Sequence, residues 1–515
     1  MFLLTASGIL VKAAGLCFRI PMNYVVGDAG MGYYNSAYSV YTFLYMLSTS
    51  GLPVALSVMI SEARGRGEKQ NAARIFKVAA AVFAVLGLLS SGVMLVFSQR
   101  LAALIRSDLS ALSIAVTAPT MLFVCISCAV RGYFQGCGNM LPTAVSQLIE
   151  ALGKLFIGIG AAVYAVRCGY PVHIVAAFAL SGLTLGSLLG AVYLVAIKLI
   201  RGERDLLPEC ACESENRLTV REALGKLVKK SVPITVSASV MSLSGLIDTV
   251  MIQRVLRSSG MTAEDAAALY GNYTSLAVPM FNLPPVFVYP VAYSLVPVVA
   301  SLFACQKTDK AAERIESALR YSVVVGLPCA LGLSAMAKPI LELIYKDSSA
   351  DLAAPLLTLL APASFFVCVL AVTNSVLEAC GHEKSTVVSM LVGAAVKCVS
   401  GVFLLKRYGI TGAPLSMLAC YLTVTVINFA FVVKFTHIKP PLLKTFLLPL
   451  GGSVLAAYFA SLTDKLLSRF GESTACIAAI AVAVAVYAVF LLFTGEVTKD
   501  EINDIIIKGR RKNET

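Results

Sequence analysis

Ala118–Leu155 reads APTMLFVCISCAVRGYFQGCGNMLPTAVSQLIEALGKL, and Ala361–Cys398 reads APASFFVCVLAVTNSVLEACGHEKSTVVSMLVGAAVKC. The two stretches align over 38 positions without a gap, and 13 of those positions are identical. Apolar bias alone would give about three or four identities. An internal duplication in a strongly apolar chain is typical of a two-lobed membrane transporter.

The composition excludes an ordinary soluble protein. The 515 residues are 58% hydrophobic and only 14% charged, with a mean hydropathy of +0.82, whereas soluble domains are roughly a quarter charged. Apolar runs long enough to cross a bilayer recur along the chain. We therefore expect an all-α polytopic membrane protein with about fourteen transmembrane helices. The net charge of +13 fits basic cytoplasmic loops, and because no DNA- or RNA-reading motif occurs, we expect no nucleic-acid partner.

The duplication sets the predicted organisation. Each copy holds six helices, an even number, so the two copies run parallel and are related by an axis along the membrane normal. Two further helices follow the second copy. The predicted parts are an N-lobe of helices 1–6 at 1–200, a cytoplasmic linker at 201–230, a C-lobe of helices 7–12 at 231–435, helices 13 and 14 at 436–495, and a cytoplasmic tail at 496–515.

The distribution of basic residues predicts the orientation. With both termini in the cytoplasm, the cytoplasmic loops and helix ends hold 27 Lys and Arg residues and the outer ones hold 11. The positive-inside rule favours that topology in the cytoplasmic membrane. In this assignment Arg131 lies among the cytoplasmic helix ends.

Four basic residues remain inside predicted spans, namely Lys12, Arg19, Lys154 and Lys397. A cation in a span costs at least ~2.5–3.5 kcal/mol on insertion scales, so each needs a physical reason. Lys12 and Arg19 are seven residues apart and share one helix face, which Asn23 continues. That face could bind an anionic head group, or Lys12 could extend to the cytoplasmic edge.

Lys154 and Lys397 occupy equivalent positions in the two copies, in helices 5 and 11. If those helices line the lobe interface, the two cations face one water-filled cleft. Glu150 precedes Lys154 by four residues, a spacing that suits an ion pair, so Glu150 could instead neutralise Lys154. The residue equivalent to Glu150 in the second copy is Gly393.

Three other features are candidates for function. Asp248, in helix 7, could bind a coupling cation, carry a proton or balance a buried arginine. Tyr38 and Tyr41 belong to a tyrosine stripe from 34 to 45, whose rings could stack on sugars or simply pack helices. Helix 8 contains five prolines between 279 and 297, which predict a kink or break.

No cofactor is expected. Three scattered histidines give no metal cluster, and the chain has no G-x-x-x-x-G-K-[ST] motif for ATP. Cys125 and Cys128 form a C-x-x-C inside an apolar run, where cysteine usually behaves as a small hydrophobe. These observations favour a transporter over an enzyme.

Two segments carry a family resemblance: SGLPVALSVMISEARGRG at 50–67 and RGYFQGCGNMLPTAVSQLIEALGK at 131–154. They resemble the stage V sporulation protein B and polysaccharide biosynthesis group of the multidrug/oligosaccharidyl-lipid/polysaccharide exporter superfamily, alongside the MurJ-like lipid II flippases. The resemblance implies two six-helix lobes around a central cleft, with helices 13 and 14 helping to house a lipid tail. It places the family's cationic cleft residue at Arg19, and it alone suggests a role in sporulation.

Three hypotheses follow. The first is a flippase that moves an undecaprenyl-pyrophosphate-linked saccharide, such as a peptidoglycan precursor, across the cytoplasmic membrane by alternating access. Its pyrophosphate would pair with Arg19 and the repeat lysines, while the tail stays among membrane lipids. The second is a proton- or sodium-coupled multidrug or organic-cation antiporter of the same superfamily, which predicts an anionic cleft. The third is a non-transporting scaffold for cell-wall synthesis enzymes.

Overall fold

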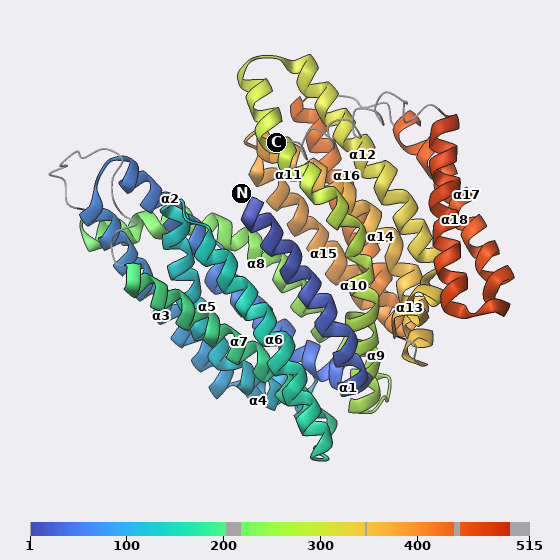
Figure 1. Cartoon of the computed structure of the whole chain (residues 1–515), viewed down its shortest axis with the longest axis horizontal. Helices are drawn as coiled ribbons and strands as arrows, with labels where there is room; N and C mark the ends of the chain where they lie inside the picture. The colour runs from blue at the N-terminus through green and yellow to red at the C-terminus, as the bar shows by residue number, and fades with distance from the viewer. Residues whose placement is uncertain (1, 202–217, 346–347, 437–442, 495–515) are drawn as a thin grey trace. The chain divides into compact units, whose positions relative to one another are not determined.

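Helices make up nearly all of the part of the chain that the structure describes (Figure 1). The structure is a computed structural model, and it describes residues 2–201, 218–345, 348–436 and 443–494. No β-strand occurs within those ranges. In lipid, a helix is one of the few structures that pair all backbone polar groups internally. The predicted all-α polytopic class is confirmed.

The chain divides into two compact units, Met1–Ser275 and Leu276–Thr515. The first contains α1 (Phe2–Thr49), α2 (Leu52–Gly65), α3 (Lys69–Val96), α4 (Ser98–Leu104), α5 (Ala111–Gly136), α6 (Leu141–Arg167), α7 (Val172–Arg201), α8 (Val220–Ser258) and α9 (Ala263–Asn272). The second contains α10 (Val278–Phe281), α11 (Leu283–Ala304), α12 (Thr308–Ala335), α13 (Ala337–Tyr345), α14 (Ser348–Ala379), α15 (Glu383–Tyr408), α16 (Gly412–Thr436), α17 (Leu448–Leu467) and α18 (Glu472–Phe493). The boundary falls in a π-helix, η3, at Tyr273–Ala277. The lobe boundaries drawn from the sequence remain predictions.

Eleven stretches of the described residues are long and apolar enough to cross a membrane. Two of them each cover a pair of predicted spans. Cys17–Gly65 contains a break at Gly27, where φ is 71° and ψ is 174°, and Glu383–Thr436 joins α15 to α16 through a short turn. The total of fourteen spans stays a prediction. The proline-rich eighth span is interrupted as expected, since η3, α10 and α11 replace one continuous helix.

The two sequence copies fold alike. Gly138 and Gly381 occupy the same turn, with φ of 78° and 74°. In each turn the glycine N–H donates to a carbonyl three residues earlier, at 3.0 Å in both copies. A Cβ on Gly87 would lie 3.0 Å from the Cβ of Cys125, and a Cβ on Gly326 would lie 3.1 Å from that of Cys368. The paired cysteines thus fill equivalent helix contacts and behave as small buried hydrophobes.

Proline removes a helical hydrogen bond, and in the second unit side chains supply the missing donors. Pro328 has no N–H for the carbonyl of Val324, and the Tyr487 hydroxyl from α18 donates to that carbonyl at 2.9 Å. Pro362 likewise has no N–H for the carbonyl of Thr358, and that carbonyl accepts a hydrogen bond from the Ser334 hydroxyl at 2.9 Å. The kinked helices therefore keep their backbone satisfied within the bilayer.

Glycines let α6 and α7 approach closely, and the two helices lie side by side in Figure 1. A Cβ on Gly153 would lie 2.6 Å from the Cα of Gly186, and a Cβ on Gly182 would overlap the backbone of Gly158. Small residues drive helix association in membranes, because lipid provides no hydrophobic force between helices. This contact fixes the position of α6 relative to α7. Glu150 and Lys154 lie on α6, so their positions in the first unit are fixed with it.

We expect Gly182→Ala to lower the melting temperature of the detergent-solubilised protein, because the added methyl group forces α6 and α7 apart. Overpacking of this kind costs about 1–3 kcal/mol. Gly160→Ala is the matched control, since Gly160 lies on the neighbouring helix α6 and a Cβ there meets nothing within 4 Å. Equal melting temperatures for the two variants would contradict the close packing.

Candidate functional site

The candidate site begins at the break in α1. Phe18, before Gly27, and Tyr34, after it, have ring centroids 5.9 Å apart. The chain therefore folds back on itself there, and a left-handed φ suits glycine at the reversal. From Tyr34 the rings of Tyr38, Tyr41 and Tyr45 continue in steps of 6.0, 5.7 and 5.8 Å. The sequence stripe is thus a continuous aromatic ladder along α1.

Lys154 reaches this ladder from α6. Its Nζ lies 4.9 Å from the ring centroid of Phe18, 5.8 Å from that of Tyr34 and 4.7 Å from that of Tyr38. Cation–π attraction acts over such distances and is worth about 2 kcal/mol when desolvated. Lys154 is half-buried, and it makes no salt bridge with any residue that the structure describes. The rings support the ammonium group without neutralising it.

Arg19 lies next to Phe18 and is also half-buried. Its Nη1 donates to the Thr274 carbonyl at 3.2 Å. In the π register that carbonyl would pair with the N–H of residue 279, which is a proline, so Arg19 supplies the missing donor. Asn35 holds the same π-helix, since its Nδ2 donates to the Ser275 hydroxyl at 2.6 Å.

The two cations lie close enough to act on each other. Arg19 follows Phe18 along α1, and Lys154 Nζ lies 4.9 Å from the Phe18 ring centroid, so the two like charges repel. A guanidinium has five N–H donors and an ammonium has three, so one bond to Thr274 leaves most of them for another acceptor. Arg19 and Lys154 together therefore remain the predicted site for an anion.

Asn23 and Lys12, the other two residues predicted on this helix face, are not shown to contact Arg19 or Lys154. Asn23 is buried in α1, and its Oδ1 has no hydrogen-bond partner among the described residues. Lys12 lies in α1, but its side chain falls outside the part of the chain that the structure describes. The shared face of Lys12 and Arg19 therefore remains a prediction.

Glu150 pairs with Arg131 and not with Lys154. Its Oε1 lies 2.8 Å from Arg131 Nη2, and Arg131 Nε donates to the Ser146 hydroxyl at 3.0 Å. Arg131 lies near the C-terminal end of α5 and is only 6% exposed, so its charge is buried inside the first unit; its position on the cytoplasmic side remains a prediction. Gly190 makes room for the carboxylate, since a Cβ there would lie 2.8 Å from Glu150 Cγ.

In the second sequence copy, hydrogen bonds between amide side chains replace the ion pair between helices. Asn374 and Gly393 stand where Arg131 and Glu150 stand in the first copy. Asn374 Oδ1 accepts from Asn428 Nδ2 at 2.5 Å, and Ser389, the equivalent of Ser146, donates to Asn428 Oδ1. An amide network thus replaces the ion pair. Both charges are missing together, whereas the lysine is present in both copies.

The structure gives the positions of the remaining predicted residues, but no contact that it describes joins them to Arg19 or Lys154. Lys397 is buried in α15 of the second unit, and Asp248 is half-buried in α8 of the first. Tyr41 is buried within the ladder, whereas Tyr38 and Tyr45 are half-buried. Roles for Lys397, Asp248 and Tyr41 remain predictions.

A further half-buried cation lies in the first unit. Lys198, which is not among the four cations predicted inside spans, lies in α7 with Nζ 2.9 Å from the ring centroid of Tyr133 and 4.4 Å from that of Phe76. The apolar run ending at Ile197 gave the signal that the helix could extend one more turn.

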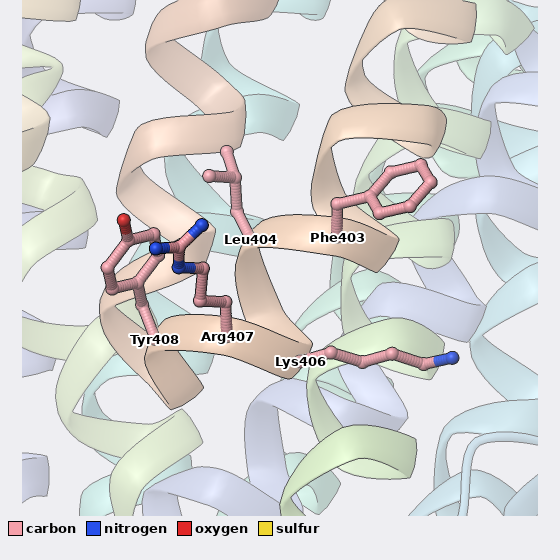
Figure 2. Close-up of a pocket in the computed structure, with 5 residues that line it drawn as sticks. All are labelled: Phe403, Leu404, Lys406, Arg407 and Tyr408. Atoms are coloured by element: carbon pink, nitrogen blue, oxygen red, sulfur yellow. The ribbon is translucent and has the colours of Figure 1, made fainter.

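A pocket of about 470 Å³ lies elsewhere, on the last turns of α15. Figure 2 shows its lining, which comes from one helix and consists of Phe403, Leu404, Lys406, Arg407 and Tyr408. It contains none of the predicted site residues. Within the described residues no group of three His, Cys, Asp or Glu side chains could hold a metal ion.

Comparison with known proteins identifies the family. The sequence model for polysaccharide biosynthesis protein matches residues 1–303. The chain belongs to the polysaccharide biosynthesis protein family. A MatE model also matches residues 233–403. The resemblance to the multidrug/oligosaccharidyl-lipid/polysaccharide exporter superfamily is therefore confirmed.

Three proteins of Bacillus subtilis (strain 168) resemble this family member. An uncharacterized membrane protein, YabM, is 28% identical, covering 98% of this chain and 94% of its own. Stage V sporulation protein B is 27% identical, covering 99% and 97%. Lipid II flippase MurJ is 22% identical, covering 84% and 81%.

Solved structures share the fold. Lipid II flippase MurJ in an inward closed conformation aligns with a TM-score of 0.67 and 15% identity, covering 96% of this chain and 99% of that one. An inward-facing MATE multidrug transporter aligns with a TM-score of 0.66 and 13% identity, covering 82% and 98%.

The buried ion pair generates a stability prediction. Glu150→Gln leaves the Arg131 guanidinium without its counter-charge, and losing one partner of a buried pair costs about 3–5 kcal/mol. The double variant Arg131→Met/Glu150→Leu should be more stable than Glu150→Gln alone, because it buries no lone charge. Thermal unfolding in detergent measures both. A double variant less stable than the single one would contradict a charge-compensated structural pair.

Proposed function

We propose that this polysaccharide biosynthesis family member is a flippase for an undecaprenyl-pyrophosphate-linked saccharide in the cytoplasmic membrane. The observation that carries the proposal is the pair of half-buried cations, Arg19 and Lys154, beside an aromatic ladder. A pyrophosphate placed between them would remove their mutual repulsion. Such a site suits a doubly anionic head group and disfavours an organic cation.

The internal repeat supports the anion site. If Lys154 were present only to neutralise Glu150, the second copy, which has Gly393 in place of that acid, would not need Lys397. The acid instead pairs with Arg131, and the two charges of that pair are absent together from the second copy. Lys154 therefore has no acid to neutralise among the described residues, and an anionic substrate would explain its charge.

Tyrosines next to the cations would hold the sugar. Tyr38 touches Lys154 by cation–π contact and is half-buried, and Tyr45 is half-buried at the far end of the ladder. Ring faces stack on sugars, and tyrosine hydroxyls hydrogen-bond to sugar hydroxyls. A saccharide attached to a pyrophosphate at Lys154 would extend along these rings, while the polyprenyl tail stays in lipid.

Arg19 also gives a physical route from binding to movement. It holds a carbonyl of the π-helix at the boundary between the two units. A pyrophosphate would compete with that carbonyl for the guanidinium, and π-helical turns are frequent at functional sites. Substrate binding would thereby bias the hinge that alternating access requires. Because the chain lacks a P-loop motif, the driving force would be the membrane potential, an ion gradient or consumption of the product.

The test is transport of a fluorescent lipid II-type substrate in proteoliposomes. Arg19→Gln keeps an N–H donor for the Thr274 carbonyl but removes the charge, and Lys154→Gln removes the second charge. We expect each to slow flipping by at least about tenfold, the effect of roughly 1.4 kcal/mol. Lys397→Gln should do the same if the repeat lysines act together.

Arg100→Gln and Lys384→Gln change exposed cations and serve as matched controls. Wild-type flipping by folded Arg19→Gln and Lys154→Gln would overturn the proposal. No flipping by the wild type, together with proton- or sodium-driven efflux of an organic cation, would establish the antiporter instead.

A second prediction concerns Tyr38. Tyr38→Phe keeps the ring that supports Lys154, whereas Tyr38→Leu removes both the ring and the stacking surface. Flipping by Tyr38→Leu should fall by about tenfold or more, given that a desolvated cation–π contact is worth about 2 kcal/mol, and Tyr38→Phe should retain most of the rate. Tyr458→Leu, an exposed tyrosine in α17, is the control. Equal rates for Tyr38→Leu and wild type would remove Tyr38 from the site.

A further inference from the structure

The first turns of α8 form an amphipathic segment at residues 220–232. One face is buried: Ala223 and Leu227 are each 1% exposed and pack into a cluster with residues of α2, α3 and α5. Ser231 continues that face and is also buried. The spacing of four residues is that of one side of a helix. The segment is therefore seated on the first unit along its whole length.

The rotation of this segment about its axis is fixed. Thr219 and Glu222 form a reciprocal capping box, with N–H to oxygen distances of 3.3 and 2.9 Å. Leu218 is held by α3, because its N–H donates to Asn71 Oδ1 at 3.0 Å and its carbonyl accepts from Arg74 at 2.5 Å. Any side chains left exposed are thus held in a defined direction.

A row of apolar side chains lies uncovered beside the buried face. Val220, Leu224, Val228 and Val232 are 60%, 39%, 44% and 49% exposed. They follow one another at intervals of four residues, so they form one stripe along the helix. The apolar arc of the segment is consequently wider than the protein surface that covers it. Such a stripe on a membrane protein needs an apolar neighbour.

Basic side chains flank the apolar stripe of the segment. Arg221, Lys226 and Lys229 are exposed, and Lys230 pairs with Glu62 of α2 at 2.7 Å. Exposed lysines and arginines flanking an apolar stripe are the mark of a helix that lies at the surface of an anionic bilayer. An acidic protein surface would match the charges but not the long aliphatic stripe beside them.

Chain continuity places the segment near the membrane surface. α8 has 39 residues, which makes it roughly 58 Å long at ~1.5 Å per residue, while the hydrocarbon core is about 30 Å thick. The predicted span occupies 231–255, so the preceding turns are not needed to cross the hydrocarbon and can lie along its surface. The sequence assigns this end to the cytoplasmic side.

We propose that residues 220–232 bind the anionic phospholipid head groups of the membrane leaflet, with the stripe from Val220 to Val232 among the acyl chains and the phosphates at Arg221, Lys226 and Lys229. The basic side chains supply attraction to phosphodiesters, and the valines and leucine supply burial. This interaction is independent of the transported substrate, because neither Arg19 nor Lys154 belongs to the segment.

The test is hydrogen–deuterium exchange of the full-length protein in nanodiscs. Exchange of the amides at 218–232 is compared between phosphatidylcholine discs and discs that also contain phosphatidylglycerol. We expect exchange to slow by about tenfold in the anionic discs, since each basic residue near an anionic surface contributes on the order of 1 kcal/mol. Raised salt should reverse the effect.

Lys226→Gln/Lys229→Gln should lose the dependence on phosphatidylglycerol, and Leu224→Ser/Val228→Ser should lose protection in both lipids. Lys307→Gln/Lys310→Gln, two exposed lysines of the second unit, is the matched control and should behave as wild type. Equal exchange of wild type in both kinds of disc would overturn the proposal. Protection that appears only with two copies of the protein per disc would assign the stripe to self-association and would also overturn it.

Discussion

The reversal of α1 at Gly27 is the constraint on which the candidate site depends. A left-handed residue in an otherwise helical stretch turns the chain back, so that Phe18 and Arg19 stand beside the tyrosine ladder. Without the reversal, Arg19 would lie far from Lys154 and from the carbonyl that it holds at Thr274. One backbone conformation therefore brings a cation, a ring stack and a π-helix together.

Buried charge is handled in two distinct ways within the first unit. Arg131 has an anionic partner at 2.8 Å and a hydroxyl acceptor, so its charge is compensated inside the protein. Lys154 has three ring faces and a cationic neighbour but no acidic partner among the described residues. The first arrangement compensates its charge within the protein, whereas the second leaves a positive charge without an acidic partner among the described residues, which is the basis of the proposed anion site.

The internal duplication acts as a comparison within one molecule. The two copies keep the same turn, the same cysteine contacts and the same lysine position. They differ at the link between the repeat helices, which is ionic through Arg131 and Glu150 in one and an amide chain through Asn374 and Asn428 in the other. Either chemistry satisfies the buried polar groups. The backbone scaffold is thus separable from the side chains that tie it together.

The sequence by itself determined the class of fold, the duplication, the break in the eighth span and the family, because these depend on apolar run length, proline and local pattern. It also singled out Arg19 and Lys154, since a cation inside an apolar run can be recognised from the sequence alone.

Only the tertiary structure decided which residues these charged side chains contact. Spacing of four residues favoured a Glu150–Lys154 pair, yet Glu150 turns to Arg131 on another helix, because the close α6–α7 packing and the space beside Gly190 direct its side chain. The partners of Arg131 and Lys198 are a carboxylate and aromatic rings on other helices, which hydropathy cannot reveal. The meeting of Arg19 with Thr274 likewise depends on a reversal and a π-helix, which are set by packing and not by the local sequence alone.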